Sequence, residues 1–355
     1  MKTAMIAAAA PFAGTSALAQ TPSKKLGVAL CGLGSLSTNQ IAPALQKTQH
    51  CRLAGIVTGS PQKAKQWQAK YDIPDRSVYS YDTMERMADN PDIDIVYVVT
   101  PNALHLEHAT KAAKAGKHVF CEKPMEISVE RCQQMIEVCA KAERMLGVAY
   151  RCQFEPHHLE CIRIAREKEL GELKIIEGAF GFVIGDPNQW RLKHALSGGG
   201  ALMDVGIYVL QATRYLTGEE PVMVSALETK TDPRKFAEVD ESIAWTATFP
   251  SGVIAYCATT FNASAPFCRF RVQTDRGWFG LDPAYNYGGL EGARSDGKPL
   301  KFPQQDHFAL EMDAFAQSIL EGKPTKVSGE EGLQDVKILM AIYESARTGK
   351  AVRIA

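Results

Sequence analysis

A Gly-x-Gly turn after the first hydrophobic run is the feature that most constrains how this chain can fold. Lys25 to Cys31 is predicted to be a buried strand, Gly32-Leu33-Gly34 a tight turn, and Thr38 to Gln46 the start of a helix. In that order the backbone N–H groups at the helix N-terminus face two glycines small enough to let phosphates approach. The pattern predicts a dinucleotide-binding unit. Ser37 replaces the third glycine of the fingerprint, and a plain turn is the alternative.

The segment after the second predicted strand, Arg52 to Val57, favours one dinucleotide over the other. An NAD site carries an acidic residue about twenty residues past the glycines, where it accepts hydrogen bonds from the ribose 2′-OH. This chain has Thr58-Gly59-Ser60-Pro61-Gln62-Lys63-Ala64-Lys65 instead. Because hydroxyl and ammonium groups suit a 2′-phosphate, we predict NADP. The alternative is that Lys63 and Lys65 lie on a solvated helix face.

The order of the predicted elements changes near residue 150. Before it, strands and helices alternate, with strands over 93–99 and 145–150, which is typical of a doubly wound parallel sheet. After it, helices near 156–168 and 201–216 accompany period-two runs at 174–182, 222–229, 242–249, 253–260 and 269–281, which predict a large open, mostly antiparallel sheet. Helices near 306–321 and 330–347 finish the chain.

A length of 355 residues suggests two domains. We expect an α/β protein with an NADP-binding Rossmann domain over residues 25–150. An α+β domain over residues 151–355 would bind substrate and form oligomers. Its terminal helices would pack back on the first domain.

The first twenty residues differ from the rest of the chain. Met1 to Gln20 has one lysine, an alanine-rich apolar run and Ala17-Leu18-Ala19, which resembles a signal peptide with a small-residue cleavage site. The run is too short and too weakly apolar to span a membrane. We therefore expect a periplasmic protein without a membrane partner. The alternative is a disordered leader on a cytoplasmic protein.

Composition excludes several other classes. Forty basic residues balance forty acidic ones, and no basic cluster with interleaved aromatics occurs, so nucleic acid is not an expected partner. The nine cysteines include no C-x-x-C pair, which argues against a zinc or iron–sulfur site, and we expect no metal. On a shared helix Cys132 and Cys139 would lie about 10 Å apart, too far for a disulfide.

Two segments could carry acid–base chemistry. Glu122-Lys123-Pro124 follows the apolar run Lys117 to Phe120, which places a lysine at the carboxyl end of a strand, where open parallel sheets bind ligands. There an ammonium could polarise a carbonyl or lower the pKa of a hydroxyl. Asp204 and Tyr208 would share one helix face, four residues apart, after Ser197-Gly198-Gly199-Gly200. The alternatives are a surface turn and a core tyrosine with a capping aspartate.

Taken together, these segments resemble the Gfo/Idh/MocA oxidoreductases, from about residue 25 to the end of the chain. Within that family the chain is most similar to the glucose-fructose and aldose-aldose oxidoreductase branch. The glucose-fructose enzyme has a long proline-rich arm before its first strand, which clasps a neighbouring subunit. Only Thr21 to Lys24 separate the leader from the first strand here, so the tetramer that the arm supports is in doubt. The motifs behind the resemblance are Gly32-Leu33-Gly34, Thr100-Pro101-Asn102 with His105, Ala115 to Val119, Glu122-Lys123-Pro124, Tyr150-Arg151, Gln189-Trp190-Arg191, Gly198-Gly199-Gly200 with Asp204, Arg214 to Pro221 and Gly329 to Gly332.

The resemblance implies a role for each matching residue. Lys123 would be the catalytic lysine, Asp204 the substrate-orienting aspartate and Tyr208 the acid/base. The sugar would contact Lys123, Arg151, Asp204 and Tyr208. The expected cofactor-binding residues are Gly32, Gly34, Ser35, Leu36, Thr58, Gly59, Ser60, Lys63, Thr100, Pro101, Asn102, His105, Glu122, Lys123, Arg151, Trp190, Arg191 and Tyr287.

The function expected on this basis is NADP-dependent oxidation of a cyclic aldose at C1 to the aldonolactone, with a second sugar reduced by the same retained cofactor. One alternative is a xylose or dihydrodiol dehydrogenase with exchanging NADP. Another is a non-catalytic NADP-binding sensor.

The sequence leaves the identity of the sugar open. Trp190, Arg191, Tyr285, Tyr287 and Asp306 could line a polyhydroxy pocket that accepts several aldoses. A sheet face that includes Ile254, Tyr256 and Val272 would be exposed and is expected to form a homodimer.

Overall fold

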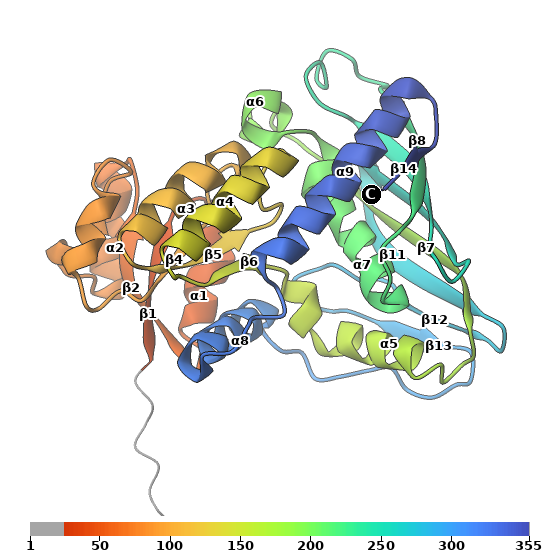
Figure 1. The fold of residues 1–355 in the computed structure, drawn as a ribbon, viewed down its shortest axis with the longest axis horizontal. Helices are drawn as coiled ribbons and strands as arrows, with labels where there is room; N and C mark the ends of the chain where they lie inside the picture. The colour runs from red at the N-terminus through yellow and green to blue at the C-terminus, as the bar shows by residue number, and fades with distance from the viewer. Residues whose placement is uncertain (1–24, 355) are drawn as a thin grey trace, which may run out of the picture.

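The computed structural model describes residues 25–354, so the expected signal peptide lies outside the described residues. Two sheets lie side by side, a smaller one built from residues 26 to 149 and a larger one built from residues 173 to 353 (Figure 1). The predicted fold class is confirmed.

The smaller sheet is parallel and has six strands in the order β3-β2-β1-β4-β5-β6, with the strand order reversing between β1 and β4. Ligands bind outside the carboxyl ends of strands at such a reversal. The strands are β1 (Leu26–Cys31), β2 (Cys51–Val57), β3 (Val78–Tyr79), β4 (Ile95–Val98), β5 (His118–Glu122) and β6 (Leu146–Ala149). The connecting helices are α1 (Ala42–Leu45), α2 (Pro61–Tyr71), α3 (His105–Lys114) and α4 (Val129–Lys141).

The larger sheet has eight strands in the order β13-β12-β11-β7-β10-β9-β8-β14, and only the β7–β10 pair is parallel. The strands are β7 (Leu173–Val183), β8 (Met223–Thr229), β9 (Ser242–Thr248), β10 (Ile254–Thr260), β11 (Asn262–Thr274), β12 (Trp278–Leu281), β13 (Gly292–Arg294) and β14 (Val352–Arg353).

Five further helices follow β6 in the described part of the chain: α5 (Pro156–Arg166), α6 (His194–Ser197), α7 (Ile207–Thr217), α8 (His307–Glu321) and α9 (Gly329–Thr348). Helix α7 packs on β7 and β10, and α9 packs on β8 and β14. Helix α8 lies under the smaller sheet, and α9 runs from α4 to the larger sheet (Figure 1). The last two helices thus contact both halves of the molecule.

Two expectations about the larger sheet are wrong in detail. The run predicted at 269–281 is two antiparallel strands, β11 and β12, because Asp275-Arg276-Gly277 turns the chain and Thr274 N–H donates to Gly277 O. Val272 does not lie on the exposed face. It pairs with Ile176, both are fully buried, and the register instead places Arg271 opposite Glu177 on the outer face.

The outer face of the larger sheet carries several exposed apolar side chains. Ile254 and Tyr256 are 45% and 47% exposed, and Leu227 is 72% exposed. A groove of about 650 Å³ crosses this face, with Glu177, Leu227, Tyr256 and Arg269 among its lining residues.

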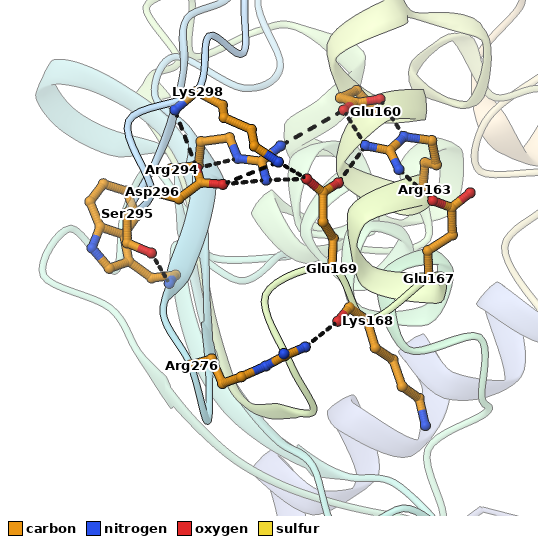
Figure 2. A network of polar contacts seen from close by, with 11 residues as sticks. Glu160, Arg163, Glu167, Lys168, Glu169, Arg276, Arg294, Ser295, Asp296 and Lys298 are labelled. Carbon is orange, nitrogen blue, oxygen red and sulfur yellow. Dashed lines mark hydrogen bonds and ion pairs between the residues drawn. The ribbon is translucent and has the colours of Figure 1, made fainter.

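A polar network fastens α5 to the β12–β13 hairpin (Figure 2). Arg294, only 7% exposed, donates to Glu169 at 2.7 Å and to Asp296 at 2.7 Å, and Arg163 of α5 donates to the other oxygen of Glu169 at 2.6 Å. Lys298 also donates to Glu169, at 2.7 Å. Several cations therefore converge on one carboxylate, and the hairpin is held by charge-assisted bonds as well as by its ladder.

All nine cysteines are free and buried. Within residues 25–354 no helix is long and apolar enough to span a membrane, and no cluster of histidine, cysteine, aspartate and glutamate could hold a metal ion.

Candidate active site

A cavity of about 1020 Å³ lies between the two sheets, at the carboxyl ends of the parallel strands. The segments that follow β1, β2, β4, β5 and β6 form one side, and residues from β7, α7 and the loops before α6 and α8 form the other. The predicted residues that line it are Gly32, Gly34, Ser35, Leu36, Thr58, Gly59, Ser60, Lys63, Thr100, Pro101, Asn102, Glu122, Lys123, Arg151, Trp190, Arg191, Asp204, Tyr208, Tyr285 and Tyr287. The structure therefore brings nearly all of the predicted residues together.

The glycine-rich turn has the geometry that a phosphate cradle needs. Gly32 has φ +99°, and a Cβ there would lie 2.7 Å from Val99 O. A Cβ on Gly34 would meet nothing within 4 Å, so its backbone is open to the cavity. Ser37 is fully buried and its hydroxyl donates to Gly32 O at 2.5 Å, so it anchors the turn where the fingerprint has its third glycine. The residues present fit a dinucleotide pyrophosphate.

The end of β2 presents hydroxyls and one ammonium. Ser60 caps α2 by accepting a hydrogen bond from Lys63 N–H at 3.3 Å, and Thr58 accepts one from Ser60 N–H at 3.2 Å. Lys63 and Lys65 are both exposed, but Lys63 lines the cavity and its ammonium donates to Leu33 O at 3.0 Å, whereas Lys65 does not line the cavity. Among the residues that the structure describes, no carboxylate lines this end of the cavity, so the donor set matches a 2′-phosphate better than a 2′-hydroxyl.

Lys123, Asp204 and Arg191 form one charged cluster in the cavity wall. The Lys123 ammonium donates to Asp204 O at 2.7 Å and lies 3.5 Å from its carboxylate Oδ1, while Arg191 Nε donates to Oδ2 at 3.0 Å. Burial alone would raise the pKa of Asp204, but the guanidinium of Arg191 and the ammonium of Lys123 hold it below its ordinary value. Asp204 is therefore an anion that keeps both cations in place.

Tyr208 has a different cationic partner from the one that the sequence suggested. Lys123 Nζ lies 4.7 Å from the centroid of the Tyr208 ring, whereas Arg151 Nε lies 3.3 Å from its hydroxyl oxygen. Burial raises the pKa of Tyr208, and the Arg151 guanidinium opposes that rise. Arg151 is itself fixed by donating to Tyr285 O at 2.5 Å. The group that favours ionisation of this phenol is therefore Arg151.

Asp204 and Tyr208 come from a helix that changes its pitch. Leu202 to Gly206 forms a π-helical turn before α7, which widens the backbone at Asp204. Both side chains still line the cavity, but the continuous α-helix predicted at 201–216 is not present.

Two predicted residues do not line the cavity. His105 is fully buried, with Nε2 2.8 Å from Thr100 O and Nδ1 3.1 Å from Pro124 O, so it ties two cavity loops together from behind. Asp306 caps α8 and pairs with Lys47 at 2.7 Å, away from the cavity.

Several lining residues were not predicted. They are Leu33, Asn39, Gln40, Tyr81, Val99, Ala149, Phe180, Phe182, Gln189, Val205, Pro266, Asn286 and Phe308. Helical spacing could have indicated Asn39, which donates to Ser35 four residues earlier at 3.0 Å. Phe180 and Phe182 are two apart on β7, and Phe180 stacks on Tyr285 with ring centroids 5.4 Å apart.

Comparison with known proteins decides the family. A family model described as an oxidoreductase family with an NAD-binding Rossmann fold matches residues 26–150, and the GFO/IDH/MocA C-terminal domain matches residues 158–280. The chain belongs to the Gfo/Idh/MocA oxidoreductase family. The family assignment made from the motifs is therefore confirmed.

Individual relatives of this Gfo/Idh/MocA protein cover nearly the whole chain. The crystal structure of aldose-aldose oxidoreductase from Caulobacter crescentus, complexed with glycerol, is 43% identical with a TM-score of 0.90, and the match covers 93% of this chain and 100% of that one. D-xylose 1-dehydrogenase [NADP(+)] from Haloarcula marismortui is 32% identical over 337 residues, 92% of each chain. A second D-xylose 1-dehydrogenase (NADP(+)), from Haloferax volcanii, is 29% identical over 332 residues, 92% of this chain and 98% of that one.

Proposed function

We propose that this protein is an NADP-dependent aldose oxidoreductase that oxidises a cyclic aldose at C1 to the aldonolactone and reduces a second sugar with the same bound cofactor. The observation that carries the proposal is the shared cavity. At one end it offers a glycine cradle with Thr58, Ser60 and Lys63, and at the other it gathers Lys123, Asp204 and Tyr208. The likeness to the aldose-aldose oxidoreductase from Caulobacter crescentus supports the choice of substrate class.

The chain's own residues would bind and orient the sugar and move one proton. Asp204 would accept hydrogen bonds from sugar hydroxyls while Arg191 and Lys123 keep it ionised. Tyr208 would have to be ionised to take the C1 hydroxyl proton; burial raises its pKa, and the nearby Arg151 guanidinium opposes that rise. Lys123 would hold the C1 oxygen as a donor. The glycine turn, Thr58, Ser60 and Lys63 would hold the NADP, and this cofactor would supply the hydride acceptor for the first half-reaction and the hydride donor for the second.

Retention of the cofactor follows from the chemistry of its site. Each charge-assisted contact to the phosphates contributes roughly 1.5 to 3 kcal/mol. An exported enzyme would meet little free NADP and could turn over only with a retained molecule.

We therefore also propose that Met1 to Gln20 is a cleaved export signal, which the mass of the mature protein would test. An intact N-terminus would favour the cytoplasmic alternative.

A dehydrogenase with exchanging NADP is the second candidate. It is favoured by the 32% identity to the Haloarcula D-xylose 1-dehydrogenase over 92% of the chain. The same catalytic residues would serve it, so the difference lies in how long the cofactor stays bound.

One experiment separates the two candidates. Protein purified and gel-filtered without added cofactor is incubated with pairs of aldoses, and lactone and alditol are measured. Under the first candidate, both products form in equal amounts and near-stoichiometric NADP co-purifies. An apo protein that makes lactone only when NADP is added, with no alditol, would establish the exchanging dehydrogenase. Absence of lactone from every aldose in both conditions would refute both candidates.

We also propose that the outer face of the larger sheet forms a homodimer. Ile254, Tyr256 and Leu227 expose apolar surface there, and the adjacent Glu177 and Arg269 supply opposite charges that a two-fold axis could pair. Light scattering at micromolar concentration should give twice the monomer mass. Leu227→Glu should then shift the protein to monomer, while a monomeric wild-type protein would contradict the proposal.

A further inference from the structure

A buried tyrosine lies between two glutamates behind the cavity wall. Tyr97 of β4 is fully buried, and its hydroxyl oxygen is 2.8 Å from Glu122 Oε1 at the end of β5 and 3.3 Å from Glu311 Oε1 of α8. Glu122 is 8% exposed and lines the cavity, while Glu311 is fully buried. The side-chain oxygens of the three residues therefore form a chain that runs from the cavity wall to the buried face of α8.

Counting donors shows that this chain needs an additional proton. A phenol has one hydrogen and can donate to only one of the two carboxyl groups. If both carboxylates were ionised, the second contact would bring two lone pairs together and two anions would face each other without water. One carboxyl group must therefore carry a proton and donate it to the Tyr97 oxygen.

The surroundings indicate that Glu311 is the protonated member. Its second oxygen, Oε2, is buried and has no hydrogen-bond partner, which an ionised carboxylate tolerates poorly. Burial and the neighbouring Glu122 raise the pKa of Glu311 well above its ordinary value. Burial also raises the pKa of Glu122, but the adjacent Lys123 ammonium, the Tyr97 hydrogen bond and the Arg151 guanidinium oppose that rise.

Of the other titratable groups around the pair, neither His307 nor Cys152 is a cation. His307 lies one turn before Glu311 on α8, and burial and Arg151 lower its pKa to about 3, so it is neutral. Cys152, on the turn against which α8 packs, acts on Glu311 only as a further negative influence. The Arg151 guanidinium acts on both carboxyl groups and opposes the rise in the pKa of each.

We propose that Glu122 and Glu311 share one proton through Tyr97, so that the pair presents a single negative charge to the wall of the cofactor cavity. Glu311 and Tyr97 are then positioning residues that hold the Glu122 carboxylate in place. The oxidised nicotinamide is cationic and the reduced ring is neutral, so this charge favours the oxidised cofactor. That last step rests on the proposed use of NADP, whereas the shared proton does not.

The shared proton is tested on the protein without cofactor. Infrared spectra of the wild-type protein at neutral pH should show the carbonyl band of a protonated carboxylic acid. Glu311→Gln should remove it, because the amide can replace the acid's donor without a titrating proton. Glu321→Gln, on the same helix but exposed, is the matched control and should retain the band. A wild-type protein without the band, or a band that survives in Glu311→Gln, would overturn the proposal.

Two further measurements keep the proposal testable if Glu311→Gln does not fold. Tyr97→Phe removes the acceptor of the acid proton and should shift the band to higher frequency; an unchanged band would refute the bridge. The folded pKa of Glu311 is raised, so the native protein binds more protons than the unfolded chain once pH exceeds the ordinary value of 4.5, and stability falls as pH rises. That loss should be smaller in Glu311→Gln than in Glu321→Gln. Equal losses would count against the shared proton.

The charge is tested separately through cofactor affinity. The ratio of the dissociation constants for NADPH and NADP+ should fall roughly tenfold in Glu122→Gln, because only the cationic form loses an attraction. Glu311→Gln should leave the ratio unchanged, since Glu122 keeps its charge. An unchanged ratio in Glu122→Gln would refute the electrostatic step. Failure of the wild-type protein to bind NADP would count against the proposed function and leave the infrared result to decide the proton.

Discussion

Alanine substitutions at the two glycines of the glycine turn should affect different properties of the protein. Gly32→Ala should lower the stability of the fold, whereas Gly34→Ala should weaken the binding of NADP. Gly32 has φ +99°, and its Cβ would lie 2.7 Å from Val99 O and 3.0 Å from Thr100 Cγ2. Gly34 has no positive φ, and its Cβ would meet nothing within 4 Å. If the empty space at Gly34 is kept for the pyrophosphate, Gly34→Ala harms only the bound state.

The magnitudes follow from these contacts. A left-handed backbone conformation costs a non-glycine residue about 1–2 kcal/mol. Forcing a methyl into a packed site adds about 1–3 kcal/mol, so Gly32→Ala should lower the free energy of unfolding by about 2–5 kcal/mol. Gly34→Ala should change it by less than about 1 kcal/mol. The same methyl between Gly34 and a phosphate would cost about 1–3 kcal/mol of binding, which is roughly 5- to 150-fold in the dissociation constant of NADP.

The assay is urea unfolding of the cofactor-free protein, followed by NADP titration monitored by intrinsic fluorescence. Gly34→Ala should unfold like the wild type and bind NADP weakly. Normal NADP affinity in a folded Gly34→Ala would show that no phosphate approaches this backbone, and the placement of the cofactor would be refuted. A Gly32→Ala protein as stable as the wild type would refute the steric argument.

Three further predictions test the site and the fold. Lys123→Ala and Tyr208→Phe should each lower kcat by about 100-fold or more while NADP stays bound; unchanged turnover would remove the acid–base mechanism. Hydrogen bonds from Lys298, Arg163 and Arg294 lower the pKa of Glu169 to about 2 from 4.5, so its contribution to stability is complete above the unfolded value and is lost as pH falls through the folded value. The difference in Tm between wild type and Glu169→Gln should therefore shrink as the solution is acidified from pH about 5 to pH about 2, and a constant difference would contradict this. A reducing agent should leave Tm unchanged, since all nine cysteines are free and buried; a fall would reveal a disulfide.

The parts of the site that could be predicted from the sequence are those that local patterns determine. A strand, a glycine turn and a helix fix one another over a dozen residues, so the glycine turn and the end of β2 lie at the edge of the sheet where the pattern predicts them, and both line the cavity. Lys123 could be placed because a lysine directly after a buried strand must lie at that edge of the sheet.

The errors concern features that depend on distant segments. Val272 was assigned to the wrong sheet face because its direction depends on the register of β11 against β7, which are far apart in the chain. Asp306 does not line the cavity, because it caps α8 and pairs with Lys47, which is far away in the chain. The hydroxyl of Tyr208 meets Arg151 rather than Lys123, because the Lys123 ammonium lies over the face of the phenol ring and not at its oxygen.

Asp240 shows how the larger domain fixes the charged cluster. Its carboxylate accepts hydrogen bonds from Gly200 N–H at 2.6 Å, Leu202 N–H at 2.8 Å and the Tyr343 hydroxyl at 2.6 Å. A Cβ on Gly200 would lie 2.0 Å from Asp240 O, so a side chain there would prevent this approach. Two groups therefore hold the turn that bears Asp204. Asp240 binds the backbone N–H groups of Gly200 and Leu202, and the Lys123 ammonium donates to the backbone oxygen of Asp204. Because Tyr343 belongs to α9, the last helix contributes to orienting the carboxylate before any sugar binds, and preorganised charges of this kind cost no rearrangement during the reaction.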